Sequence, residues 1–168
     1  MQRSAKKIAL LGLCTAVAMV LAYAELLLPP LFTAVPGIKL GLPNVAIILV
    51  LYRLGAKEAA LVSLVRMAAV SMLFGTPVTF LYSLAGGALS LGAMILLKRL
   101  NLLSTVGVSV AGGVLHNVGQ ILMAMLLLGT AKLGYYLIVL AVTGTVSGIL
   151  IGIASGIAVK RIPLRLPH

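Results

Sequence analysis

Acidic residues are almost absent from this sequence, which contains only Glu25 and Glu58 among its 168 residues. The chain therefore has no pair of nearby carboxylates for acid–base catalysis. It also has no aspartate-rich motif that could hold Mg²⁺ against a diphosphate, and no phosphate-binding loop of the P-loop type. These absences predict that the chain has no catalytic residues and is not an enzyme by itself.

Metal-binding and disulfide-forming residues are equally scarce. Cys14 is the single cysteine, so no intrachain disulfide can form. The two histidines are His116 and the terminal His168. A metal cage usually needs several histidine, cysteine or carboxylate ligands at suitable spacing. We therefore expect no metal site and no cofactor.

Charge is scarce as a whole, because charged residues make up 9% of the sequence against roughly 25% in soluble domains. Hydrophobic residues make up 62%, and the mean hydropathy is +1.23. A soluble protein of this size could not bury so much apolar surface, so the sequence predicts one integral membrane domain over residues 1–168. The formal charge is +11. Its basic residues lie mostly between apolar segments, which indicates membrane orientation rather than nucleic-acid binding.

The apolar segments predict an all-α fold, a polytopic bundle of six transmembrane helices. A helix needs about 20 apolar residues to cross the hydrocarbon core. The predicted helices cover about residues 7–28, 43–54, 58–74, 77–97, 104–128 and 134–159. The second has only about 12 residues and is roughly 18 Å long. It is too short to cross the membrane alone. Either the preceding loop supplies the remaining length across the membrane, or neighbouring helices shield this helix from lipid.

The positions of lysine and arginine predict that both termini are cytoplasmic. In that orientation the inside segments contain Arg3, Lys6, Lys7, Arg53, Lys57, Lys98, Arg99, Lys160, Arg161 and Arg165. Only Lys39 and Lys132 fall outside, and Arg66 falls within a predicted helix. An excess of basic residues in the loops of one side is typical of the cytoplasmic side.

The longest connection, residues 29–42, is predicted to be an ordered outer capping loop. Several prolines stiffen it, Gly37 and Gly41 permit unusual dihedral angles, and much of the remainder is apolar. A stiff, apolar loop is expected to pack onto the bundle. It could be a lid over a site that opens outward, or an ordered plug with no gating role.

Arg66 is the most costly polar residue in the apolar background. It lies about 15 Å along its helix from Lys57, and an arginine at mid-membrane costs on the order of 3 kcal/mol. It should therefore face the interior and have a partner. Glu25, at the outer end of the first helix, is the available acid. Arg66 either forms a structural pair with Glu25 or binds an anionic group of a ligand.

A second polar group comprises His116, Asn117 and Gln120. His116 and Gln120 are four residues apart and share a helix face, whereas Asn117 lies about 100° away. Such side chains can simply bond to a neighbouring helix, or they can line a ligand pocket in which they donate and accept hydrogen bonds. Near the C-terminus, four glycines spaced four apart, at positions 144, 148, 152 and 156, indicate close helix packing or a partner surface.

Four stretches in combination resemble the Gx transporter family, many of whose members are labelled heptaprenyl diphosphate synthase component I. They are "PGIKLGLPN" (36–44), "LVRMAAVSMLFGT" (64–76), "FLYSLAGGALS" (80–90) and "VSVAGGVLHNVGQ" (108–120). The resemblance covers about residues 8 to 158. It implies a relationship to the substrate-binding S-components of energy-coupling-factor (ECF) transporters. These are six-helix proteins of the prokaryotic cytoplasmic membrane that capture a small molecule under a first capping loop.

The resemblance implies the residues of a ligand pocket and the partners of the protein, and alternative functions stay open. The pocket would contain Glu25, Lys39, Asn44, Arg66, Tyr82, His116, Asn117 and Gln120. Ala18 and Ala22 would dock a coupling protein that works with ATPases, and the substrate would be a partly anionic, partly apolar small molecule of unknown identity. The family label instead implies an accessory membrane subunit of a polyprenyl diphosphate synthase. A third alternative is a quinone- or flavin-delivery component of a membrane redox system.

Overall fold

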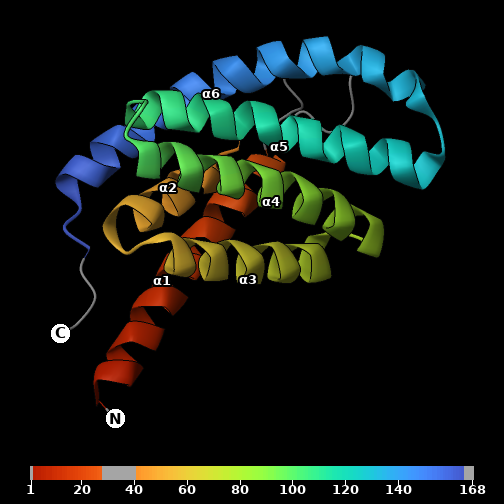
Figure 1. The fold of residues 1–168 in the computed structure, drawn as a ribbon. Coiled ribbons are helices and arrows are strands. Elements are labelled where there is room, and N and C mark those ends of the chain that lie inside the picture. Colours follow the sequence, from red (N-terminus) through yellow and green to blue (C-terminus); the bar gives the residue numbers. More distant parts are fainter. Residues whose placement is uncertain (1, 28–40, 165–168) are drawn as a thin grey trace.

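Six α-helices and one short 3-10 helix form the part of the chain that the structure, a computed structural model, describes: residues 2–27 and 41–164 (Figure 1). The helices are α1 (Gln2–Leu27), α2 (Pro43–Arg53), α3 (Ala56–Phe74), α4 (Pro77–Leu100), α5 (Thr105–Leu128), η1 (Ala131–Tyr135) and α6 (Tyr136–Arg161). These described residues contain no strand, which confirms the all-α class. Lys39 and nearly all of the predicted capping loop lie outside the described residues.

Four helical segments are long and apolar enough to cross a membrane: Ala5–Leu27, Pro77–Leu100, Thr105–Leu128 and Ala131–Arg161. They confirm a multi-pass membrane protein. The other two helices are different. The 11 residues of α2 rise only about 16 Å, and α3 contains Lys57, Glu58 and Arg66. Six complete crossings therefore stay a prediction.

Local capping signals set the ends of the long helices. Before α4, the Thr76 side chain accepts from the Thr79 backbone while the Thr79 side chain accepts from the Thr76 backbone, and Pro77 occupies the first turn. Before α5, the Ser104 side chain accepts from the backbone of Gly107. Gly129 ends α5 in the left-handed conformation, with a φ of 62°.

The helices α3, α4, α5 and α6 follow one another side by side, and α1 crosses the bundle beneath them (Figure 1). Two contacts fix the direction of α1 against α3. Lys7 pairs with Glu58 at 2.9 Å near the start of both helices, and the rings of Tyr23 and Phe74 lie 5.3 Å apart near the end of both. The two helices therefore run in the same direction, and Glu25 lies at the end of the bundle where α3 finishes.

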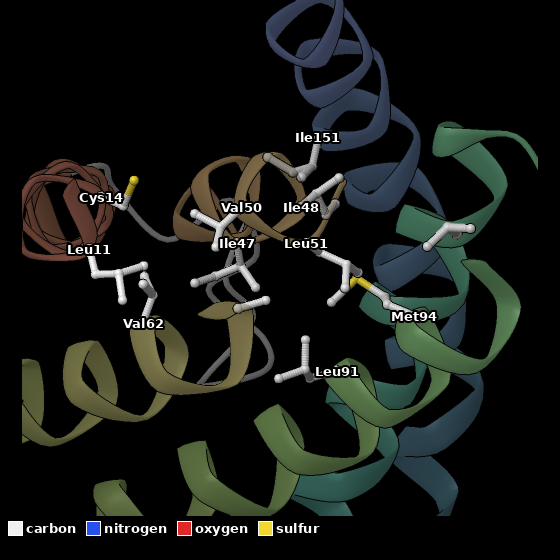
Figure 2. Packing of buried hydrophobic residues seen from close by; sticks show 12 residues of the cluster. Leu11, Cys14, Ile47, Ile48, Val50, Leu51, Val62, Leu91, Met94 and Ile151 are labelled. Carbon is white, nitrogen blue, oxygen red and sulfur yellow. The ribbon is translucent and has the colours of Figure 1, made fainter. Parts of the chain in front are cut away.

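The short helix α2 lies at the centre of the hydrophobic core. Figure 2 shows Ile47, Ile48, Val50 and Leu51 of α2 surrounded by side chains of α1, α3, α4 and α6. These four α2 residues are at most 1% exposed. Neighbouring helices therefore shield α2, which is one of the two alternatives that the sequence left open for this short helix.

Cationic side chains stabilise the last turns of α2 and α6. The Lys98 ammonium donates to the Leu51 carbonyl at 2.5 Å and lies 5.1 Å from the centre of the Tyr52 ring. The Arg53 guanidinium donates to the Val159 carbonyl in the last turn of α6. The final carbonyls of a helix lack partners within the helix, so these bonds satisfy them and join α2, α4 and α6 at one end of the bundle.

Glycines bring α6 against α5 at backbone distance. A Cβ atom added at Gly148 would lie 2.6 Å from the Cα of Val110, and one at Gly152 would lie 2.7 Å from the Cα of Val106. Such close contacts are typical of membrane helices that associate through small residues. Gly156 has open space around it. Internal packing therefore explains all but the last glycine of the stripe.

Candidate functional site

Arg66 lies on α3 with its guanidinium turned into the protein. The residue is half-buried, and its Nε atom is fully enclosed without a hydrogen-bond partner among the described residues. Buried polar atoms of native proteins are nearly always hydrogen-bonded. The Glu25 carboxylate is close enough to act electrostatically on this guanidinium. The charge of Arg66 thus has a counter-charge nearby, while its enclosed N–H has capacity for another acceptor.

Glu25 also binds the backbone that enters α2. Its Oε1 atom accepts a hydrogen bond from the Gly41 backbone N–H at 2.5 Å. Gly41 has a φ of 79°, which L side chains rarely adopt, and its carbonyl accepts from the Asn44 backbone N–H at 2.8 Å. The last turn of α1 is therefore joined to the first turn of α2, and Asn44 lies beside this junction.

His116 and Gln120 lie where α5 touches α4. A Cβ atom added at Gly86 of α4 would lie 2.7 Å from the His116 carbonyl oxygen, 3.1 Å from His116 Cε1 and 2.9 Å from Gln120 Cγ. Both side chains are half-buried. Tyr82, also half-buried, precedes Gly86 by one turn and shares its helix face. Gly86 was not singled out from the sequence, although it is part of a small-residue run in α4.

Arg66 on α3 and His116 on α5 lie at about the same level of the bundle, next to neighbouring residues of α4. Gly87 of α4 contacts α3, because a Cβ atom there would lie 2.7 Å from the sulfur of Met67. Gly86, the preceding residue, contacts His116 on α5. The structure therefore brings Arg66, Tyr82, His116 and Gln120 to neighbouring turns of three adjacent helices.

Asn117 points elsewhere. It is buried, and its Nδ2 atom donates to the Leu140 carbonyl of α6 at 2.8 Å. A Cβ atom added at Gly144 would lie 2.9 Å from the same Nδ2 atom, so the glycine makes room for this amide. Asn117 therefore bonds α5 to α6, on a different side of α5 from His116 and Gln120.

The two alanines predicted to dock a partner are inside the bundle. Ala18 is 0% exposed and Ala22 is 6% exposed. They share the face of α1 that contains Leu11 and Cys14, which belong to the core cluster with α2 and α3. Other helices of the same chain already cover this face, so it offers no alanine surface to a partner in this structure.

A metal site and a cavity were the other candidates for a functional site. The described residues include no group of three or more histidine, cysteine or acidic residues that could hold a metal ion. A cavity of about 420 Å³ is lined by Ala131, Lys132, Gly134 and Tyr135, around the 3-10 helix η1. None of the predicted site residues lines that cavity.

Comparison with family models gives a match over most of the chain. A family model described as heptaprenyl diphosphate synthase component I matches residues 14–157, which includes all the described site residues. No curated protein and no solved structure matches the chain.

Proposed function

The chain belongs to the heptaprenyl diphosphate synthase component I family, and we propose that it is the substrate-binding membrane subunit of an uptake transporter of the ECF S-component type. The observation that supports this function best is the enclosed Nε atom of Arg66, which has no acceptor among the described residues. An enclosed guanidinium N–H that lacks an acceptor among the described residues suits a carboxylate or phosphate group, because such groups accept hydrogen bonds from arginine.

The proposed ligand is partly anionic and partly apolar. Arg66 would bind its anionic group, while Tyr82, His116 and Gln120 would donate or accept hydrogen bonds with its other polar atoms. The surrounding helices are strongly apolar and suit the rest of the ligand. Glu25, Asn44 and Lys39 would form the side of the pocket nearest the capping loop. Asn117 would support the pocket by holding α6 against α5.

The proposed setting is the cytoplasmic membrane, with both termini in the cytoplasm and a polytopic coupling protein and ATPases as partners. The buried positions of Ala18 and Ala22 mean that the coupling protein would bind another surface. Side chains of α1 that face outward include Ile8, Leu13 and Val17.

A second candidate function is an accessory membrane subunit of a polyprenyl diphosphate synthase, which the description of the matching family favours. In that case the partner would supply the aspartates and Mg²⁺, since this chain has only two acidic residues. The apolar interior would then receive the growing prenyl chain. A purified synthase that makes identical chain lengths with and without this protein would refute this function.

One experiment separates the two functions. The tagged protein is purified from native membranes in mild detergent, and co-purifying proteins and small molecules are identified by mass spectrometry. A coupling protein with two ATPases supports the transporter, whereas a soluble prenyltransferase supports the synthase subunit.

The small molecules test the site directly. The wild type is compared with Arg66→Gln and with Arg99→Gln, whose residue is exposed at the end of α4. An anionic compound that is recovered with the wild type and Arg99→Gln but lost from Arg66→Gln supports the pocket. Equal recovery from all three would refute it.

A further inference from the structure

The whole chain has two carboxylate side chains, and they lie at opposite ends of the bundle. Glu58 binds the Lys7 ammonium at 2.9 Å, where α1 and α3 begin. Glu25 lies near the other end of α1, where it accepts the Gly41 N–H at 2.5 Å. Glu25 is therefore the one side-chain carboxylate available to balance the charge of Arg66.

We propose that Glu25 is the resident counter-ion of Arg66, and that an anionic ligand enters the site together with one proton, which the Glu25 carboxylate accepts. This inference rests on the proposed function, because it assumes that Arg66 receives the anionic group. It adds that capture of the anion is linked to proton uptake.

Charges at this site must balance closely, because the interior of a membrane-embedded bundle has a low dielectric constant. Among the described residues of the site, Arg66 and Glu25 supply one positive and one negative charge, so without ligand the two groups together carry no net charge. A bound anion would leave two negative charges beside one positive charge, and like charges repel strongly where water is excluded. Two anionic groups that share a site favour protonation of one of them. A proton on Glu25 restores neutrality while the ligand remains bound to the guanidinium of Arg66.

The other ionisable groups near this end are less suited to receive the proton. The guanidinium of Arg66 is already protonated and has no site for a further proton. His116 on α5 can accept a proton, so the experiment must separate it from Glu25. A protonated carboxyl group keeps a carbonyl oxygen, so the bond from Gly41 survives. The step is the addition of one proton from solution to the carboxylate, with no other bond made or broken.

The test uses octane-1-sulfonate, an amphiphilic anion whose charge does not change between pH 5.5 and 8. Octan-1-ol, which has the same alkyl chain and no charge, is the control ligand. Binding to the full chain in detergent is measured by calorimetry in buffers of different ionisation enthalpy, which counts protons. We expect uptake of about one proton per sulfonate, and affinity that rises by up to about tenfold for each pH unit that is lowered. Octan-1-ol should show neither effect.

Glu25→Gln is the decisive variant, because its amide oxygen can still accept from Gly41 while the negative charge is gone. We expect it to bind octane-1-sulfonate about tenfold or more tightly than the wild type at pH 8, without proton uptake. His116→Gln should bind the sulfonate more weakly, because His116 belongs to the proposed pocket, but it should still take up about one proton for each sulfonate bound. If Glu25→Gln does not fold, the proton count of the wild type and of His116→Gln decides the question.

Three outcomes overturn the proposal. Binding that depends on Arg66 but takes up no proton would refute it and leave the proposed function intact. Proton uptake that is lost in His116→Gln but persists in Glu25→Gln would assign the proton to His116. If neither the wild type nor Glu25→Gln binds the sulfonate, this proposal and the anionic pocket of the proposed function both fail.

Discussion

The contact between α4 and α5 at Gly86 gives the sharpest test of the structure. In Gly86→Ala, the new Cβ atom would lie 2.7 Å from the His116 carbonyl oxygen and 2.9 Å from Gln120 Cγ. The first of these atoms belongs to the backbone of α5, so it cannot move aside as a flexible side chain can. The two helices must separate by several tenths of an ångström over this turn.

Two effects of opposite sign set the magnitude. Overpacking of a close contact typically costs about 1–3 kcal/mol. Replacement of glycine by alanine inside a helix contributes about 0.5–1 kcal/mol of stabilisation. We therefore expect Gly86→Ala to lower the free energy of unfolding by roughly 1–2 kcal/mol. We also expect weaker ligand binding, because His116 and Gln120 are displaced.

Gly92→Ala is the matched control, since Gly92 lies on the same helix and a Cβ atom there meets nothing within 4 Å. It should be neutral or slightly stabilising. Both variants are measured by denaturant unfolding in one detergent, with helix content followed by circular dichroism. If Gly86→Ala is as stable as Gly92→Ala, α4 and α5 do not pack as described, and the arrangement of the proposed pocket is wrong.

Three further predictions concern single contacts and use the same unfolding measurement. Asn117→Ala removes the bond to the Leu140 carbonyl and should cost about 1 kcal/mol, so an unchanged stability would argue against this link between α5 and α6. Lys98→Met removes the bond to the Leu51 carbonyl and should also cost about 1 kcal/mol; a stability equal to the wild type would contradict a cap on α2. Glu58→Gln removes a partly exposed ion pair and should change stability by less than about 1 kcal/mol, with a larger loss pointing to a buried pair.

The sequence was sufficient to predict the helical class, because long apolar segments can satisfy their backbone in a membrane only as helices or closed barrels. It was less informative about which side of each helix faces inward. Lipid and protein interior are both apolar, so hydropathy finds a membrane helix without fixing its rotation. Ala18 and Ala22 illustrate this: the spacing of small residues is the same whether the close neighbour is a partner or, as here, the chain's own core.

The link between Glu25 and Gly41 was beyond sequence reasoning for a different reason. The two residues are 16 positions apart, and the Gly41 backbone N–H donates the hydrogen bond to the Glu25 carboxylate. Any residue except proline has such an N–H. No side-chain type marks such a donor. The sequence could identify Glu25 as the acid available to Arg66 because the chain has so few acids, but it could not show that the same carboxylate also binds the entrance to α2.

The polar residues of α5 show that the sequence held more information than hydropathy uses. Residues four apart on a helix share a face, so Gly112 shares a face with His116, and Gly113 shares one with Asn117. In the structure Gly112 contacts Ser90 and Met94 of α4, whereas Gly113 contacts the Gly144 carbonyl of α6. His116 therefore faces α4, which can approach closely because of Gly112. Asn117 faces α6, which can approach closely because of Gly113. Read in this way, the adjacent glycines predict that His116 and Asn117 serve different interfaces, which separates a pocket residue from one that holds two helices together.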